Sequence, residues 1–416
     1  MTEARIHAGS RAYWRATLAL CLGSFMIFSN LYVTQPLLPM LAHTFGISAL
    51  EASASFTIST LTLGISLLVY GPLSDALGRR GIMLFTMAGV LLTTLCLSQV
   101  QEYSWLIVLR ALQGFFLGGL PAIAVAYMGD EFDREALVMA VGLYISANSL
   151  GGIGGRLMGG FFGEAFGWST TFLIVGVVSL IILAVFFALL PHSRHFQPQR
   201  FRLGVSLGNM GAHLKNPLLI LAYLIGGFNF FIFINQYSYI TFVLGSEPYS
   251  LSPKYLGLLF LTYLTGTLAS TVAGKVGRHV PQPLCMAGGI VILMIGTLVT
   301  LSHALPLIIL GFFINSFGFF FAHSTASSWV SRNALKAKAS ASSMYLVFYY
   351  IGASTGGLYL HPFWEWMGWQ GVVMGSWIVL AGTLTAALCL YRLSVKAQDK
   401  DTQSVSAAAS AVGQGS

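Results

Sequence analysis

Charged residues are scarce in this sequence: Asp, Glu, Lys and Arg make up only 8% of its 416 residues. Soluble domains carry about 25% of these residues, so the deficit is roughly threefold. Apolar residues account for 56% of the chain instead. Because a membrane-spanning helix needs about 20 apolar residues, the chain has room for about a dozen of them. The composition excludes a water-soluble enzyme and indicates an all-α membrane protein.

Motifs for catalysis, cofactor binding and ATP hydrolysis are also lacking. The four cysteines fall within apolar runs and form no C-x-x-C pair, which argues against a disulfide framework or a metal site. There is no G-x-x-x-x-G-K-[ST] motif, no metal-ligand cluster and no nucleophile triad. The net charge of +8 is spread among loops, which is atypical of nucleic-acid binding. We therefore expect no enzyme activity, cofactor, metal or nucleic-acid partner.

Twelve apolar runs predict twelve transmembrane helices in two groups of six. The runs lie at about 16–36, 52–72, 82–100, 104–128, 137–162, 169–190, 217–243, 254–274, 283–302, 305–329, 340–361 and 370–391. A polar, basic stretch separates the sixth run from the seventh. The predicted organisation is an N-terminal tail (1–15), a six-helix bundle (16–190), a linker (191–216), a second six-helix bundle (217–391) and a disordered tail rich in Ala, Ser and Gln (392–416).

Lys and Arg residues fall on one side of these spans. If both termini lie inside, 18 of the 21 are in inside loops, and outside loops hold only Lys254. Arg110 and Arg156 fall within spans. This distribution follows the positive-inside rule. It predicts a multi-pass protein of the cell inner (cytoplasmic) membrane with both termini in the cytoplasm.

The two halves of the chain repeat one another. FMIFSNLY at 25–32 recurs as FFIFINQY at 230–237. A Tyr and a Trp 24 residues apart recur in the fifth and eleventh spans, which aligns Gly167 with Gly368. Repeated halves of this kind are the arrangement in which a substrate binds at mid-membrane while the halves rock. The repeat predicts two pseudo-symmetric six-helix bundles.

The loop between the second and third spans carries a pattern of glycine and charge. It reads GPLSDALGRR, or G-x-x-x-D-x-x-G-R-R. Glycine permits a tight turn and close helix approach, and charge is tolerated at the membrane boundary. This pattern resembles the loop signature of the major facilitator superfamily. The residues that carry the resemblance are Gly71, Asp75, Gly78, Arg79 and Arg80.

The resemblance implies that this loop is a conformational latch. In the superfamily the Asp meets the start of span 11, and the first Arg pairs with an acid at the inner end of span 4. Asp75 and Arg79 are the matching residues here, and Asp130, Glu131 and Asp133 are the acids at that position. Such a latch favours the outward-facing state.

Span 4 contains Arg110, Gln113 and Gly114, which resemble the R-x-x-Q-G signature of the superfamily. An arginine held within a span must face a cavity or hydrogen-bond partners. The resemblance implies that Arg110 takes part in substrate binding or proton transfer. The alternative is a structural arginine tied to backbone carbonyls.

Span 5 carries a glycine pattern, G-x8-G-x3-G-x-x-x-G-G, which resembles the drug:proton antiporter branch of the superfamily. Its glycines are Gly142, Gly151, Gly155, Gly159 and Gly160. We expect them to let helices pack closely and to seal the interface between the halves against leak. The branch usually has Pro after the third of these glycines, whereas this sequence has Arg156. Arg156 either adds a second cation to the membrane interior or snorkels.

None of the thirteen Asp and Glu residues lies at the centre of a span, whereas many drug:proton antiporters have an acid there. Two cations without a carboxylate partner favour an anionic or strongly hydrogen-bonding solute. His323 is the only histidine well inside a span, and histidine titrates near neutral pH. We therefore name His323, together with Arg110, as candidate proton-coupling residues; the alternative for His323 is a hydrogen-bonded core residue.

Polar and aromatic residues within apolar runs either line a cavity or tie helices together. The repeat favours the cavity for Asn30 and Asn235, because spans 1 and 7 line the cavity in the superfamily. The candidate substrate-binding residues are Arg110, Arg156, Asn30, Asn235, Gln236, Asn148, Tyr32 and Tyr237.

Two further stretches, at 144–160 and 322–330, resemble the arabinose-efflux-permease-like group of the superfamily. The resemblance predicts a secondary active transporter that works by alternating access. We expect a monomer in the lipid bilayer that exports a small organic solute, anionic or sugar-like, in exchange for protons. The alternatives are a proton symporter or facilitator for solute uptake, and a membrane sensor that transports nothing.

Overall fold

The computed structural model describes residues 5–196, 198, 204, 208, 211–334 and 338–413. Within these residues, ten helical runs are long and apolar enough to cross a membrane. Two of these runs exceed fifty residues, and each is broken once. The breaks lie at Gly167, where φ is +80°, and at Met367 and Gly368. Each break divides its run into two crossings, so the twelve predicted spans are accounted for in an all-α fold.

The first half of the chain forms seven helices and one 3-10 turn. They are α1 (Arg11–Tyr32), η1 (Gln35–Leu37), α2 (Leu38–Phe45), α3 (Ala49–Leu77), α4 (Arg79–Leu97), α5 (Tyr103–Leu117), α6 (Gly119–Glu131) and α7 (Arg134–Leu189). The first predicted span ends in η1, at the QPLLP sequence, because Pro36 cannot donate a helical hydrogen bond.

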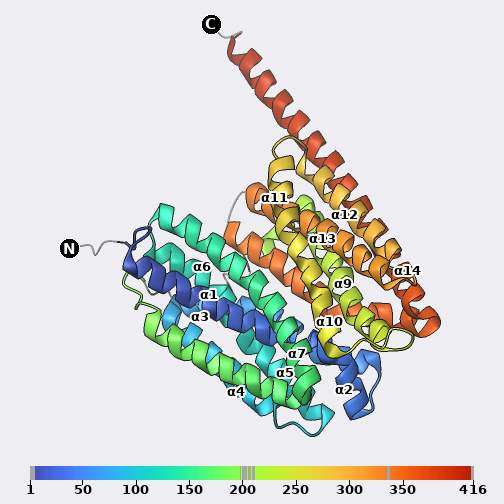
Figure 1. Cartoon of the computed structure of the whole chain (residues 1–416). Helices are drawn as coiled ribbons and strands as arrows, with labels where there is room; N and C mark the ends of the chain where they lie inside the picture. Colours follow the sequence, from blue (N-terminus) through green and yellow to red (C-terminus); the bar gives the residue numbers. More distant parts are fainter. Residues whose placement is uncertain are drawn as a thin grey trace. The chain divides into compact units, whose positions relative to one another are not determined.

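From Pro217 onward, the described residues form the following helices and a 3-10 turn. They are α9 (Pro217–Gly245), α10 (Pro253–Leu259), η2 (Phe260–Leu264), α11 (Thr265–Val276), α12 (Gln282–Val299), α13 (Leu305–Asn333) and α14 (Lys338–Gly413). The sequence predicts a disordered tail over 392–416, whereas the structure continues α14 as helix to Gly413 (Figure 1). Alanine, which is frequent in this segment, has the highest intrinsic helix propensity.

Local sequence signals explain several helix ends. Ser48 and Glu51 form a capping box at the start of α3, in which each side chain accepts a backbone N–H of the other residue. Gly46 ends α2 with φ +63°, and Gly78 separates α3 from α4 with φ +106°. Positive φ is accessible to glycine at no steric cost, which is why glycine stands at these turns.

The chain packs as two compact units. Unit 1 comprises Met1–Gly208, Ile234–Tyr263 and Tyr350–Val372, and unit 2 comprises Asn209–Phe233, Leu264–Tyr349 and Val373–Ser416. The divisions fall within α9, within η2 and within α14. Packing therefore assigns part of the predicted second bundle to unit 1. The bundle boundaries expected from the sequence, 16–190 and 217–391, remain a prediction.

Unit 1 is built around α1 and α7, which pack along one another (Figure 1). At one end an apolar cluster holds Val33 and Leu37 against Trp168 and Phe172. We call this the Glu164 end, because Glu164 and Pro253 also lie there, and the end with the α3–α4 turn the Arg79 end. In unit 2, α13 packs against α12 and α11. Apolar side chains such as Leu92 and Ile181 remain exposed, as expected of surfaces that face lipid.

Candidate functional site

Arg110, on α5, is fully buried in unit 1 with 0% of its surface exposed. Its Nε donates to the carbonyl of Ser55 at 2.9 Å, and its two terminal nitrogens donate to the carbonyls of Asn30 and Leu31 at 3.1 Å each. A further N–H donates to the Gln113 Oε1. Four hydrogen bonds thus join the guanidinium to α1, α3 and its own helix. These contacts are those of the structural alternative for Arg110, and its predicted roles in substrate binding and proton transfer remain predictions.

The hydrogen bonds of Arg110 continue into a buried polar network. Gln113 donates to the Thr94 hydroxyl at 2.7 Å, and Thr94 donates to the Asn30 Oδ1 at 2.6 Å. The Asn30 amide donates in turn to the Ser179 hydroxyl at 2.9 Å. Because both polar atoms of its side chain are bonded to other helices, Asn30 ties α1 to α4 and α7 rather than presenting its amide to a cavity.

Arg156, on α7, is also buried, with 1% of its surface exposed, but its surroundings are aromatic. The centre of its guanidinium lies 3.8 Å from the ring of Tyr32 and 4.5 Å from each of the rings of Phe260 and Tyr263. Its Nε donates to Gln35 Oε1 at 2.7 Å, and other N–H groups donate to the Gly152 carbonyl at 3.1 Å and the Tyr263 hydroxyl at 3.4 Å. We call Tyr32, Phe260 and Tyr263 the ring box. All these partners are neutral.

The predicted residues of the seventh span also lie in unit 1, and Tyr237 contacts the ring box. The ring of Tyr237 stacks on Phe260, with centroids 5.2 Å apart, and its hydroxyl contacts that of Thr262 at 2.5 Å. Asn235 donates to the carbonyl of Ala353 at 2.9 Å, and Gln236 is buried. The structure therefore gathers Arg156, Tyr32 and Tyr237 in one place.

The last predicted substrate residue, Asn148, lies elsewhere. It is half-buried on α7, and its Oδ1 accepts a hydrogen bond from Ser24 of α1. Asn148 is therefore one of the side chains that hold these two helices together.

The glycines of α7 differ in what they touch. A Cβ at Gly151, Gly155 or Gly159 would come within 2.8 Å of backbone atoms of the first span, so only glycine permits this approach. A Cβ at Gly160 would lie 2.6 Å from the Pro253 carbonyl instead. Gly142 differs from the other four, since a Cβ there would meet no atom within 4 Å.

The α3–α4 turn holds the charged residues expected of a latch. Arg79 pairs with Asp75 and donates from Nε to Asp130 at 3.0 Å, as the resemblance implies. Arg80 instead donates to the carbonyls of Leu190 and Phe187 at 3.1 and 2.8 Å. The turn itself depends on Gly78, whereas a Cβ at Gly71 would meet no atom within 4 Å. The predicted contact of Asp75 with the start of span 11 remains a prediction.

His323 lies in unit 2, on α13, within an aromatic cluster. Its Nδ1 is 2.9 Å from the hydroxyl of Tyr345. Its ring stacks on that of Phe319 with centroids 5.7 Å apart, and it lies 4.8 Å from the ring of Tyr349. The imidazole is half-buried and has a hydroxyl beside it that can exchange a proton.

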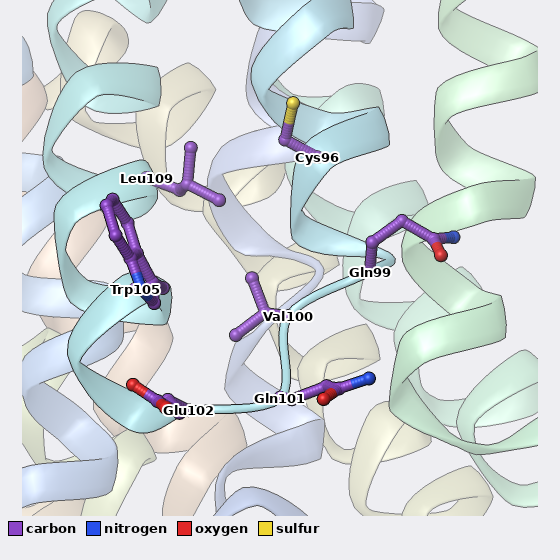
Figure 2. A pocket seen from close by; sticks show the side chains of 7 residues that line it. All are labelled: Cys96, Gln99, Val100, Gln101, Glu102, Trp105 and Leu109. Carbon is purple, nitrogen blue, oxygen red and sulfur yellow. The ribbon is translucent and has the colours of Figure 1, made fainter.

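The pocket drawn in Figure 2 is not at any of these residues. It has a volume of about 330 Å³ and lies at the loop from α4 to α5. The side chains that line it are mostly exposed: Cys96, Gln99, Val100, Gln101, Glu102, Trp105 and Leu109. Within the described part of the chain, no group of three His, Cys, Asp or Glu residues is placed to hold a metal.

Sequence reasoning missed three partners of Arg156. Gln35 lies between two apolar segments, where a glutamine is itself a sign of a buried hydrogen bond. Phe260 and Tyr263 lie in an apolar run, where aromatic residues are common and give no sign of a bound cation. Only the packing of η2 against α7 brings them to the guanidinium.

Comparison with known proteins identifies the class. The family model of the Major Facilitator Superfamily matches residues 20–357. The chain is 37% identical to the uncharacterized MFS-type transporter YybF of Bacillus subtilis (strain 168), over 95% of this chain and 98% of that protein. This chain therefore belongs to the major facilitator superfamily, and it is a multi-pass membrane transporter rather than an enzyme.

A second relative and a solved structure agree with this assignment. The chain is 37% identical to the inner membrane transport protein YnfM of Escherichia coli (strain K12), over 90% of this chain and 89% of that protein. The crystal structure of a bacterial homolog to human lysosomal transporter Spinster, in an inward-facing and unoccupied conformation, superposes with a TM-score of 0.72. It is 14% identical and covers 92% of this chain and 96% of its own. This likeness supports the fold alone.

Proposed function

We propose that this transporter exports a small organic anion in exchange for protons by alternating access. Arg156 carries the proposal. A buried guanidinium needs hydrogen bonds or a counter-charge, and the partners of Arg156 are rings, an amide, a carbonyl and a hydroxyl, all neutral. A solute with a carboxylate or phosphate would supply the missing charge with a bidentate match to the guanidinium. Arg110, by contrast, already donates four hydrogen bonds within its own bundle.

His323 is the proposed proton carrier. The unperturbed pKa of histidine makes it the one side chain that changes charge near neutral pH. The hydroxyl of Tyr345, 2.9 Å from Nδ1, provides a partner for either protonation state, since it can donate to a neutral ring or accept from a charged one. The glycine pattern of span 5 supports the antiport direction, because it resembles the drug:proton antiporter branch.

The proposed topology follows the distribution of cations. The Arg79 end of unit 1 faces the cytoplasm, and the Glu164 end faces outward, since the loops predicted to lie inside hold 18 of the 21 Lys and Arg residues, Arg79 and Arg80 among them. The protein acts as a monomer in the inner membrane with both termini inside. Light scattering of the purified protein measures the oligomeric state, and a stable dimer would contradict this part of the proposal.

The decisive test is solute exchange in proteoliposomes that hold a pH-sensitive dye. Candidate organic anions, sugars and lipophilic cations are added outside vesicles with an acidic lumen. Antiport predicts that an anion raises the luminal pH as protons leave, and a symporter would lower it. A facilitator would give counterflow with no pH change, and a sensor would give no flux. Transport of cationic dyes in preference to anions would contradict the proposed substrate class.

Coupling is tested separately with His323→Gln. The variant should retain solute counterflow but lose the accumulation that a pH gradient drives. His43→Gln is the matched control, because His43 is exposed at the end of α2. Undiminished gradient-driven accumulation in His323→Gln would exclude this histidine as the proton carrier.

A further inference from the structure

One face of α7 makes a continuous contact with the segment 253–263. Arg156, Gly160, Gly163 and Glu164 lie at positions i, i+4, i+7 and i+8, which share one side of a helix. All four contact α10, η2 or the residue before α10. The contact lies within unit 1 and runs from the buried Arg156 to the exposed Glu164 at the Glu164 end.

The buried part of this contact depends on the guanidinium of Arg156. Phe260 and Tyr263 of η2 each present a ring 4.5 Å from its centre, and Tyr32 of α1 closes the box at 3.8 Å. A cation over aromatic faces is attracted by the ring quadrupole, most strongly where water is excluded. Gln35 links this site to the seventh span, because it accepts from Arg156 and donates to the Ser238 hydroxyl at 3.3 Å.

The middle of the contact is backbone against backbone. A Cβ at Gly160 would lie 3.1 Å from the Cα of Gly257, and a Cβ at Gly257 would lie 2.8 Å from the carbonyl oxygen of Arg156. Two facing glycines therefore bring α7 and α10 closer than other residues allow. This closeness places Arg156 within reach of the rings of η2.

The exposed part of the contact depends on Glu164. Its carboxylate accepts hydrogen bonds from the Ser252 hydroxyl and from the backbone N–H of Lys254, the latter at 3.2 Å. The ammonium of Lys254 lies 5.5 Å from the ring of Phe161, three residues before Glu164 along α7. A negative group of α7 thus holds the first residues of α10.

The segment that α7 holds ends in irregular helix. α10 has seven residues, and η2 interrupts it with five residues of 3-10 geometry before α11 begins. A stretch of 3-10 helix inside a span is often a hinge. The division between the two units also falls in η2, after Tyr263. The 253–263 segment therefore has a structural boundary at which it can part from α11.

We propose that Arg156 and Glu164 form a two-point clasp that holds the 253–263 segment on α7 and keeps the Glu164 end closed. Arg156 is a positioning residue in this clasp: its charge binds rings that belong to a segment far away in sequence. Opening of the Glu164 end must remove the guanidinium from the ring box, which makes it available to an anion. The clasp rests on the proposed function only for this last step, since closure itself is a property of the packing.

A disulfide between α7 and α10 measures closure without any substrate. A Cβ built at Gly163 lies 3.9 Å from the Cβ of Pro253, within the range for a disulfide, and its nearest neighbour is the flexible end of Leu37. The reporter is Gly163→Cys with Pro253→Cys in a chain whose four native cysteines are replaced by alanine. The rate of oxidative cross-linking in membranes is then compared between clasp variants.

We expect Arg156→Gln to slow cross-linking about tenfold and Glu164→Gln to slow it two- to threefold. Arg156→Lys should restore part of the rate, because lysine keeps a cation at the rings but not the planar contact to Gln35. Arg15→Gln is the control, since Arg15 bonds only the Ala188 carbonyl among its described contacts. A merely structural arginine would not be rescued by charge alone.

An unchanged cross-linking rate in Arg156→Gln and in Tyr263→Leu would overturn the clasp. Tyr263→Leu removes one ring of the ring box and keeps the cation. It therefore tests the clasp even if Arg156→Gln does not reach the membrane. The result is independent of transport. If the variants cross-link more slowly but no anion flux is found, the proposed substrate is rejected and the clasp is retained. If anion flux is found but cross-linking is unchanged, the clasp is rejected and the proposed substrate is retained.

Discussion

The two buried arginines of unit 1 are held in opposite ways. Arg110 donates to three backbone carbonyls of α1 and α3 and to a glutamine of its own helix. Arg156 lies among three rings, two of which belong to η2, more than one hundred residues along the chain. The backbone carbonyls of a packed helix cannot leave the guanidinium unless the bundle unfolds. Rings on a separate segment can leave it when that segment moves. The comparison teaches that a membrane arginine becomes structural or movable according to what its guanidinium binds.

The largest effect on stability is expected from Arg110→Gln. The change would leave three buried carbonyls without their donor, and each unsatisfied buried polar group costs about 1–3 kcal/mol. Lysine should not rescue it, because a single ammonium cannot reach three carbonyls on two helices. Thermal unfolding in detergent, followed by the fraction that stays monodisperse, measures the effect. A variant as stable as wild type would show that the comparison is wrong.

Arg156→Gln should separate transport from stability. Loss of the cation–π contacts is expected to cost about 2 kcal/mol, less than the change at Arg110. Exchange of the anionic solute should fall at least about tenfold, which corresponds to about 1.4 kcal/mol. Initial rates in proteoliposomes and unfolding midpoints should be measured on the same preparation. Equal losses of stability in the two arginine variants would remove the distinction between them.

Asp75→Asn tests a charge that is accessible to solvent. Arg79 would keep Asp130 but lose its i,i+4 partner, and partly exposed pairs are worth about 0.2–1 kcal/mol. We expect lower transport with little loss of membrane insertion. An immunoblot of cell membranes measures insertion, and the exchange rate in vesicles measures transport. Wild-type exchange would refute the latch.

The smallest effect is expected at Asp133, outside the membrane spans. The Ala136 N–H donates to this carboxyl and, with His7, lowers its pKa below the ordinary value. A lowered pKa in the folded state stabilises the protein above the unfolded pKa of about 4, and this stabilisation is lost as the pH falls below it. Asp133→Asn should therefore lower the unfolding midpoint slightly at pH 7. The unfolding midpoints of the two proteins should converge as the pH falls through the lowered pKa of Asp133.

Much of the fold was predictable because it depends on local sequence. Proline and glycine set the local backbone by their residue type. They account for the break of the first span at QPLLP, for the turn at Gly78 and for the equivalence of Gly167 and Gly368. Both of the aligned glycines have positive φ, at +80° and +56°, where a long helical run divides. The ion pair of Arg79 with Asp130 also agrees with the resemblance on which it was expected.

The candidate site was less predictable, because it depends on packing. The repeat favoured a cavity for Asn30, yet its amide is used by Thr94 and Ser179. Arg110 matched a known signature, and its contacts nevertheless favour the structural alternative. Arg156 departs from the signature, and its guanidinium lies among rings of a separate segment, as a movable cation requires. Hydrophobicity places all three within the membrane but says nothing about which atoms lie next to them.

The sequence by itself predicted twelve membrane spans, because scarce charge and apolar runs act over a few residues at a time, and its motifs resembled the major facilitator superfamily. Only the tertiary structure decided the partners of the two arginines. Gln35 and Tyr263 lie 121 and 107 residues from Arg156, and chain separations of that size are closed only by helix packing.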